Sequence, residues 1–134
     1  MMTSRAAPLP GAFTPTCSEY QLPAYEGAHE ELTKYVDDVY CISVNDAFVM
    51  NAWARDLNIK NVKMIPDGCG TFTRSMGMLV NKPAQGFGMR SWRYAGIIND
   101  GKVEAMFEEK GFNNFSDDDE PYTVSDPEYV LQNT

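Results

Sequence analysis

The chain has 134 residues, of which 43% are hydrophobic and 22% are charged, and its formal net charge is −8. This composition is typical of a folded domain, and the acidic balance disfavours nucleic acid as a partner. No apolar run approaches the ~20 residues that cross a bilayer, and the N-terminus lacks the apolar core of a signal peptide. We therefore expect a single domain over residues 1–134 of a cytoplasmic protein that binds neither nucleic acid nor a membrane.

The first half of the chain predicts helix, strand and helix in that order. Residues 16–35 carry spaced apolar and aromatic side chains, which indicates a helix bent at Pro23. Residues 39–44 form a short apolar run that indicates a buried strand. Asn45 or Asp46 can cap a second helix. Its apolar residues recur at helical spacing: Phe48, Val49, Ala52, Trp53 and Leu57.

The second half predicts a strand at residues 62–65 and a short helix with an irregular end at residues 72–80. The clearest local pattern is an antiparallel hairpin of residues 93–99 and 102–108. Asp100–Gly101 joins the two strands, and this pair readily takes the positive φ values of a tight hairpin turn. A final helix begins after Ser125, which stands at an N-cap position. Alternating strands and helices indicate an α/β layered domain of thioredoxin-like outline.

The strongest chemical feature is a cysteine at the head of the first helix. Thr14 can cap this helix and Pro15 can be its first residue, so Cys17 falls in the first turn. Unpaired N–H groups at a helix N-terminus favour a thiolate and are expected to lower the thiol pKa. Cys17 is therefore a candidate nucleophile, and the alternative is a small buried hydrophobic side chain.

The spacing Pro10-x-x-x-Thr14-x-x-Cys17 matches the P-x-x-x-T-x-x-C signature of peroxiredoxins. The segment PGAFTPTCS resembles the type 5 (atypical) class, and the resemblance extends from Pro8 to the C-terminus. Further segments are similar to the glutaredoxin-linked and glutaredoxin-fused members of that class: CISVNDAFVMNAWA, MIPDG, TFTRSMGMLV and GFGMRSWRYAGIINDGKVEAMF. The resemblance implies a thioredoxin-like fold with a central mixed sheet flanked by helices, and a homodimer.

The resemblance also implies an activity, the reduction of hydrogen peroxide or alkyl hydroperoxides in antioxidant defence and redox homeostasis. Cys17 corresponds to the peroxidatic thiolate, which becomes a sulfenic acid. Thr14 matches the threonine that hydrogen-bonds the peroxide, and Pro10 matches the proline that shields the pocket from water. Arg93 matches the arginine that reaches the thiolate from a neighbouring strand, and a guanidinium suits that role because it stays charged. Arg90 is the competing candidate, and we interpret it as a rim or surface charge.

Two departures from the family pattern stand out. Family members carry further N-terminal strands and a full strand leading into the cysteine loop, whereas only nine residues precede Pro10 here. We therefore expect a truncated domain that lacks its N-terminal strands. Gln21 replaces a histidine that many members carry four residues after the cysteine, and His29 is expected to be an exposed polar residue.

The remaining cysteines bear on how the oxidised enzyme is recycled. No cysteine stands near the C-terminus, where two-cysteine members place the resolving thiol. Cys41 lies in a predicted strand and is expected to be structural. Cys69 lies in a turn and could either resolve Cys17 or be a bystander. The resemblance then implies a one-cysteine scheme with external glutathione and a separate glutaredoxin, or thioredoxin, and no bound cofactor.

Two further expectations remain open. No ligand spacing for a metal is present, and the acidic run 117–120 is expected to be a solvated loop. The alternative function is a catalytically weak, peroxiredoxin-derived redox-sensing or interaction module. Repeated turnover of peroxide would distinguish the enzyme from this module.

Overall fold

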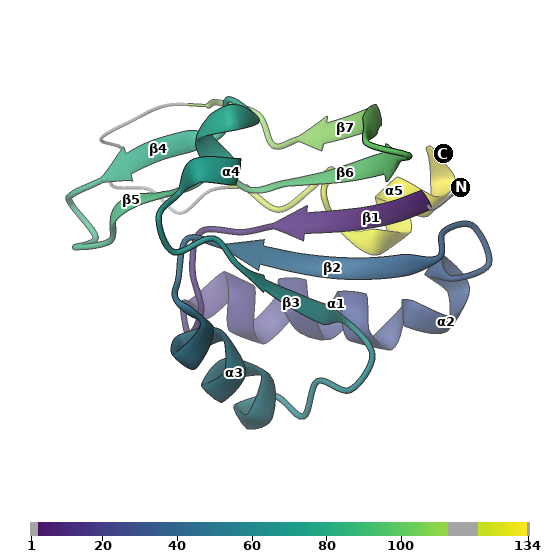
Figure 1. Cartoon of the computed structure of the whole chain (residues 1–134), viewed down its shortest axis with the longest axis horizontal. Coiled ribbons are helices and arrows are strands. Elements are labelled where there is room, and N and C mark those ends of the chain that lie inside the picture. Colours follow the sequence, from purple (N-terminus) through teal and green to yellow (C-terminus); the bar gives the residue numbers. More distant parts are fainter. Residues whose placement is uncertain (1–2, 113–120, 134) are drawn as a thin grey trace.

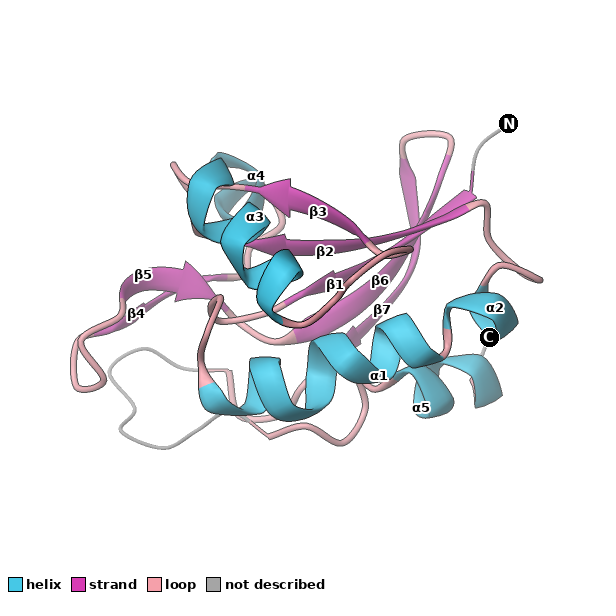
Figure 2. Cartoon of the chain, turned by 90° about the horizontal axis from the view of Figure 1, so that it is seen from below, coloured by secondary structure: helices cyan, strands magenta, loops and turns pink. Residues whose placement is uncertain are grey.

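A five-stranded sheet with helices packed against it forms the centre of the computed structural model, which describes residues 3–112 and 121–133 (Figures 1 and 2). The strands are β1 (Thr3–Pro8), β2 (Asp38–Ser43), β3 (Lys63–Pro66), β4 (Leu79–Lys82), β5 (Gly88–Ser91), β6 (Tyr94–Asn99) and β7 (Lys102–Glu108). The helices are the π-helical turn η1 (Cys17–Gln21), α1 (Leu22–Gly27), α2 (His29–Leu32), α3 (Ala47–Asp56), α4 (Thr71–Ser75) and α5 (Pro127–Gln132). No helix of the described part is long and apolar enough to cross a membrane.

The order of the strands in the central sheet is β3-β2-β1-β6-β7. β1 is parallel to β2 and antiparallel to β6, with Ala6 opposite Tyr40 on one side and opposite Gly96 on the other. The sheet is therefore mixed, as the thioredoxin-like class predicts. The expectation that no full strand leads into the cysteine loop is wrong, because β1 forms and is the middle strand of this sheet. The six residues Thr3–Pro8 are enough to form this strand, which pairs with β2 on one side and with β6 on the other.

The main hydrophobic core lies between one face of the sheet and the helices α1, α3 and α5. Side chains alternate between the two faces of a strand, and the inward set comes from β1, β2 and β6. These sheet residues are Ala7, Val39, Cys41 and Ala95. The helix residues packed on them are Leu22, Tyr25, Met50, Trp53 and Val130. Trp53 is fully buried, so its truncation to alanine would cost about 3–5 kcal/mol.

The predicted hairpin is confirmed. β6 and β7 pair antiparallel, with Asn99 opposite Lys102. Asp100 and Gly101 have φ values of 53° and 78°, so both central residues of the two-residue turn are left-handed. This geometry matches the right-handed twist of the strands it joins. The hairpin fixes the position of the residues immediately before β6, where Arg93 lies.

Several local predictions differ from the structure. The expected helix over residues 16–35 is divided into η1, α1 and α2, and a turn at Ala28 separates the last two. The N-cap of α5 is Asp126 rather than Ser125, because the Asp126 carboxylate accepts a hydrogen bond from the Tyr129 N–H. The pair β4 and β5 was not predicted, because residues 79–82 and 88–91 belong to a small separate sheet with weak strand patterns.

The helix α3 agrees with its prediction except on one face. Asp46 caps it, and its carboxylate accepts from the Val49 N–H at 2.8 Å. Phe48 was expected on the apolar face but is 85% exposed.

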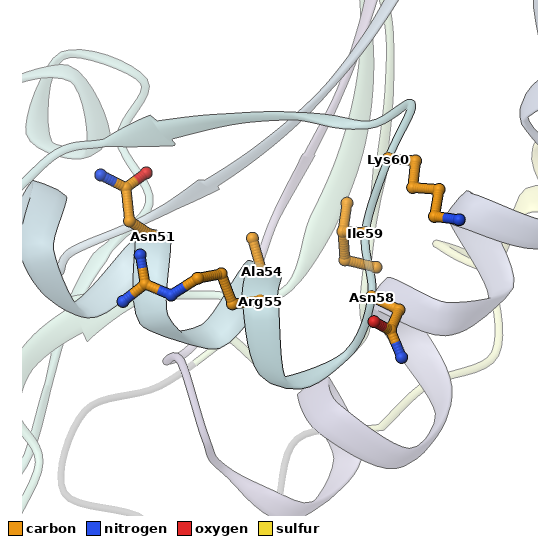
Figure 3. A pocket seen from close by; sticks show the side chains of 6 residues that line it. All are labelled: Asn51, Ala54, Arg55, Asn58, Ile59 and Lys60. Carbon is orange, nitrogen blue, oxygen red and sulfur yellow. The ribbon is translucent and has the colours of Figure 1, made fainter.

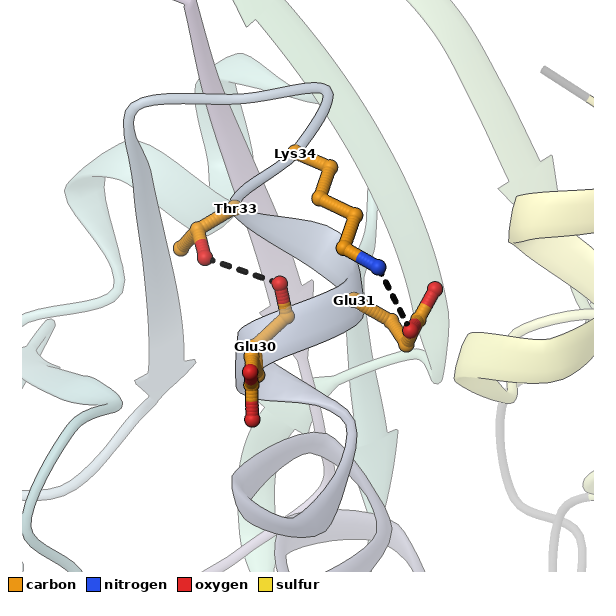
Figure 4. A network of polar contacts seen from close by, with 4 residues as sticks. All are labelled: Glu30, Glu31, Thr33 and Lys34. Carbon is orange, nitrogen blue, oxygen red and sulfur yellow. Dashed lines mark hydrogen bonds and ion pairs between the residues drawn. The ribbon is translucent and has the colours of Figure 1, made fainter.

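Two polar contacts lie at the C-terminal end of α2. The Lys34 ammonium forms an ion pair with Glu31 at 2.9 Å, and the Thr33 hydroxyl donates to the Glu30 carbonyl (Figure 4). Exposed pairs of this kind contribute little to stability.

Candidate active site

Cys17 is the first residue of η1, and its side chain is fully buried. The helical turn begins at Pro15, whose ring fixes φ near the helical value, and the Ser18 N–H donates to the Thr14 carbonyl at 2.9 Å. The Trp53 indole N–H donates to the Ser18 hydroxyl at 3.0 Å. The turn that carries the thiol is therefore anchored to α3 and the core.

The loop before Cys17 surrounds the thiol. Pro10 and Gly11 are both buried, and the Thr14 hydroxyl donates to the Gly11 carbonyl at 2.6 Å. The Thr14 side chain and the Gly11 backbone both favour the thiolate and so act to lower the pKa of Cys17. The structure thus places the predicted residue Thr14 one helical turn before the buried Cys17, with Pro10 buried at the start of the same loop.

Asn45 holds this loop in place from the end of β2. Its Oδ1 atom accepts from the Ala12 N–H at 3.0 Å and from the Ser43 hydroxyl at 2.6 Å. From the sequence alone, Asn45 is a candidate helix cap and has no other role. The sequence signal for its role in holding the loop is its position after a buried strand. Side chains at the end of a central strand lie close to the loops at that edge of the sheet.

Arg93 lies immediately before β6 and is 1% exposed. Its Nη2 atom lies 3.9 Å from the Cys17 Sγ atom. The Nη1 atom donates to the Pro121 carbonyl at 3.1 Å. The guanidinium therefore contacts the thiol from one side while the backbone near the C-terminus holds it from the other.

Gln21 is a site residue to which the sequence analysis gave no role. It is fully buried, and its Oε1 atom accepts from the Arg93 Nε atom at 2.9 Å. Its Nε2 atom donates to the Pro8 carbonyl at 3.3 Å, so Gln21 joins the end of β1 to the arginine. The signal was its spacing of four residues from Cys17, which places both side chains on one face of a helix.

Arg90, the competing arginine, lies on β5 at the edge of this loop. Its Nε atom donates to the Phe87 carbonyl at 3.0 Å, and its guanidinium lies 5.5 Å from the Phe87 ring centroid. A Cβ atom added at Gly11 would lie 2.8 Å from the Arg90 Nη1 atom. Arg90 therefore packs against Gly11 of the loop and interacts with Cys17 only through its charge, whereas Arg93 contacts the thiol.

Burial dominates the electrostatics of the thiol. The pKa of Cys17 is raised above that of an ordinary cysteine because burial disfavours the thiolate more than Arg93, Thr14 and Gly11 favour it. The expectation of a lowered pKa is therefore wrong for this arrangement. The reason is that η1 is a five-residue turn within the core, where the loss of solvation outweighs the attraction of a helix N-terminus.

The other titratable residues from the sequence analysis lie elsewhere. Cys41 is buried on β2, and burial raises its pKa well above the ordinary value, with the Cys17 thiol adding to the effect. Cys69 is exposed in the turn before α4. His29 begins α2 and is half-buried rather than exposed. The acidic run 117–120 lies outside the described residues.

In the part of the chain that the structure describes, no three His, Cys, Asp or Glu side chains gather as a metal site would require. A surface pocket at the C-terminal end of α3 is lined by the polar residues Asn51, Arg55, Asn58 and Lys60 with Ala54 and Ile59 (Figure 3). None of its residues is a predicted site residue.

Comparison with known proteins places this fold and site in one class. A family model described as Redoxin matches residues 8–123. A peroxiredoxin of Rhizobium etli is 59% identical over 125 residues, covering 92% of this chain and 69% of the relative. The chain belongs to the peroxiredoxin family.

Two solved structures show the same likeness in three dimensions. The Plasmodium falciparum antioxidant protein, a 1-Cys peroxiredoxin, superposes with a TM-score of 0.95 at 38% identity, over 99% of this chain and 80% of that one. The reduced Prx3 of Vibrio vulnificus in complex with H2O2 superposes with a TM-score of 0.85 at 38% identity, over 99% of this chain and 82% of that one.

Proposed function

We propose that this protein is a thiol peroxidase that reduces hydrogen peroxide and alkyl hydroperoxides through Cys17. The observation that carries the proposal is the contact of the Arg93 guanidinium, whose Nη2 atom lies 3.9 Å from Sγ, with the buried Cys17 thiol, whose thiolate the Thr14 side chain also favours. A nucleophile, a fixed cation and a hydroxyl therefore lie together, which is what cleavage of an O–O bond requires.

In the proposed reaction, the Cys17 thiolate attacks the terminal oxygen of the hydroperoxide. A sulfur lone pair forms the S–O bond while the O–O bond breaks, and its electrons leave with hydroxide or an alkoxide. The leaving oxygen takes a proton to become water or an alcohol, and Cys17 is oxidised to a sulfenic acid.

The surrounding residues have distinct tasks in this step. Arg93 stabilises the negative charge that develops on the leaving oxygen, because its donors are fixed and its charge persists at every working pH. The Thr14 hydroxyl hydrogen-bonds the bound peroxide, and Pro10 keeps water out of the pocket. The relative from Vibrio vulnificus, solved with H2O2, supports hydrogen peroxide as a substrate.

We further propose a one-cysteine cycle in which external glutathione, with a separate glutaredoxin, reduces the sulfenic acid. Cys41 is buried on a strand and cannot move to Cys17 without disrupting the sheet. The relative from Plasmodium falciparum is a 1-Cys peroxiredoxin, which supports this scheme. Cys69 is exposed, so its role as a resolving thiol must be tested directly. Thioredoxin is the alternative to glutathione and glutaredoxin as the reductant.

A homodimer and a cytoplasmic location complete the proposal. Phe48 is 85% exposed and Phe13 is 53% exposed, and aromatic side chains of this size are enriched at interfaces. A second copy of the chain would remove both from water.

The second candidate function is a redox-sensing or interaction module with weak catalysis. The complete burial of Cys17 and its raised pKa favour this alternative, since both slow the first attack. A sensor would oxidise once and then change its assembly, whereas an enzyme would continue to turn over.

The test is a turnover assay with hydrogen peroxide, glutathione and glutaredoxin. Many equivalents of peroxide should be consumed per protein chain, and Cys17→Ser should abolish consumption. Consumption of a single equivalent with the same reductants would identify the sensing module. No oxidation of Cys17 in the intact protein would reject both functions.

A further inference from the structure

Glu109 follows β7 and is fully buried, although glutamate is rarely found in a protein core. Its backbone is hydrogen-bonded to Arg93 itself and to the preceding residue, Trp92. The Glu109 N–H donates to the Arg93 carbonyl at 3.2 Å, and the Glu109 carbonyl accepts from the Trp92 indole N–H at 2.8 Å. Glu109 is thus fixed beside Arg93 before its side chain makes any contact.

The Glu109 carboxylate binds a segment that lies 14 to 16 residues further along the chain. It accepts hydrogen bonds from three consecutive backbone N–H groups and two hydroxyls of residues 123–125. We call residues 121–125 the strap. The Thr123 N–H and hydroxyl lie 2.8 and 3.0 Å from Oε1. The Ser125 N–H and hydroxyl lie 3.0 and 2.8 Å from Oε2, and the Val124 N–H lies between the two oxygens at 3.1 and 3.0 Å.

The other end of the strap holds the arginine. The Pro121 carbonyl accepts from the Arg93 Nη1 atom at 3.1 Å, and the Arg93 guanidinium lies 5.9 Å from the Tyr122 ring centroid. The Tyr25 hydroxyl donates to the Ser125 carbonyl, so the strap is also attached to α1. Thr123, which the carboxylate binds, is therefore only two residues along the chain from Pro121, whose carbonyl orients Arg93.

We propose that Glu109 is a positioning residue that keeps the Arg93 guanidinium directed at Cys17 by fixing the strap. This inference rests on the proposed peroxidase function. The contacts of the side chain are with residues 123–125 rather than with the thiol, so it acts through the strap and Arg93. An ionised carboxylate suits the task because it accepts hydrogen bonds on both oxygens and donates none.

The chemistry of the five donors predicts how the site responds to change. Glutamine at this position has nearly the same shape, but its NH2 group would face N–H and hydroxyl donors where Oε1 or Oε2 now accepts. Buried groups that lose their partners force the segment to rearrange. The strap would then shift, the Pro121 carbonyl would leave Arg93, and the guanidinium would lose its fixed direction. A displacement of about 1 Å in a catalytic group can reduce a rate by as much as ~10²-fold.

The experiment compares Glu109→Gln with Glu108→Gln, a substitution at the exposed last residue of β7. The first measurement is the single-turnover rate of Cys17 oxidation by hydrogen peroxide, and the second is the pH midpoint of Cys17 alkylation. We expect Glu109→Gln to lower the rate by ~10- to 100-fold and to raise the midpoint, because the thiolate loses its cation. Glu108→Gln should match the wild type in both measurements.

A double-mutant cycle separates positioning from a general loss of stability. In an Arg93→Met background, Glu109→Gln should have almost no further effect on the rate, because the residue acts through Arg93. Equal losses in both backgrounds would overturn the proposal. If Glu109→Gln does not fold, Thr123→Val serves instead, since it removes one hydroxyl donor and should lower the rate a few-fold with the same dependence on Arg93.

The outcomes also distinguish this inference from the proposed function. A wild-type protein whose Cys17 does not react with peroxide would reject the peroxidase. A reactive wild type with unchanged rate and midpoint in Glu109→Gln, or in Thr123→Val, would leave the peroxidase intact and reject the role of Glu109.

Discussion

The Nη2 atom of Arg93 lies 3.9 Å from the Sγ atom of Cys17, although 76 positions separate the two residues in the sequence. This is a long hydrogen bond even for a sulfur acceptor, so it is not the contact that chiefly fixes the guanidinium in place. Gln21 and the Pro121 carbonyl do so instead, at 2.9 and 3.1 Å. The cation is therefore positioned before substrate arrives, with its Nη2 atom directed at the sulfur.

The first prediction concerns the shape of this cation. Arg93→Lys keeps the charge but cannot bond Gln21, Pro121 and the reacting oxygens at once, since an ammonium lacks the planar arrangement of donors. We expect the rate constant for oxidation of Cys17 by hydrogen peroxide to fall by ~10²-fold or more. Stopped-flow measurement of the oxidation under single-turnover conditions checks this.

Arg90→Lys is the matched control for that experiment. Arg90 bonds the Phe87 carbonyl and packs on the Phe87 ring, outside the contact with the thiol. Its conservative replacement should change the rate by less than about threefold, as most substitutions outside a reacting centre do. A full rate in Arg93→Lys together with a large loss in Arg90→Lys would reverse the assignment of the two arginines.

The second prediction is the pH dependence of the reaction. Because burial raises the pKa of Cys17, the thiol is mostly protonated at neutral pH, and the thiolate fraction grows as pH rises. The oxidation rate should therefore increase from pH 7 to pH 9 without reaching a plateau below about pH 8.5, the pKa of a free thiol. A plateau below pH 7 would show that Arg93 and Thr14 outweigh burial.

The third prediction applies the same shift to stability. Above about pH 8.5 an unfolded chain releases the thiol protons of Cys17 and Cys41, while the folded chain retains them because burial raises both pKa values. The unfolded state then binds fewer protons, so the free energy of unfolding falls as pH rises. Urea unfolding at pH 8 and pH 10 measures the loss, and Cys41→Val should make it smaller. An equal loss in Cys41→Val and the wild type would exclude the contribution of Cys41.

Much of the fold was predictable because the signals are local. The hairpin turn needs only Asp100 and Gly101, and the cap of α3 needs only Asp46 three residues before the N–H it accepts from. The π-helical form of η1 was not predictable, because a residue-spacing pattern does not distinguish it from an α-helix. The exposure of Phe48 was not predictable either, since helical spacing alone does not say which face meets the sheet.

The site shows the same division. The resemblance placed Pro10, Thr14 and Cys17 within a short motif, and the structure brings them together with Arg93. Gln21 and Glu109 had no assigned role because their tasks depend on partners distant in the sequence, 72 residues away for the Gln21 bond to Arg93. The raised pKa of Cys17 likewise follows from burial, which a local pattern does not measure.

The fourth prediction concerns recycling. Cys41 is buried on β2 and Cys69 is exposed in a turn, so we expect neither to form a disulfide with Cys17 during turnover. The double variant Cys41→Ala, Cys69→Ser should retain most of its activity with glutathione and glutaredoxin. Mass spectrometry of peroxide-treated protein without thiols should find sulfenic or over-oxidised Cys17. Recovery of a Cys17–Cys69 disulfide, with activity lost in Cys69→Ser, would instead make this a two-cysteine enzyme.

The last prediction tests how closely the cysteine loop is packed. A Cβ atom added at Gly11 would lie 2.8 Å from the Arg90 Nη1 atom and 3.1 Å from the Thr14 Cγ2 atom. The end of the Arg90 side chain can move aside, but Thr14 belongs to the loop and its hydroxyl bonds the Gly11 carbonyl. Gly11→Ala should therefore displace Thr14 from the thiol and lower the peroxide rate by ~10-fold or more while the chain still folds.

Gly27→Ala is the control for this substitution, because nothing lies within 4 Å of a Cβ atom added there. Gly27 is the last residue of α1, and alanine is favoured over glycine in helices by up to ~1 kcal/mol, so this variant should be as stable as the wild type or slightly more stable. Its rate with peroxide should be unchanged. An unchanged rate in Gly11→Ala as well would mean that the loop adjusts freely, and that the hydrogen bond of Thr14 to Gly11 does not position the hydroxyl for catalysis.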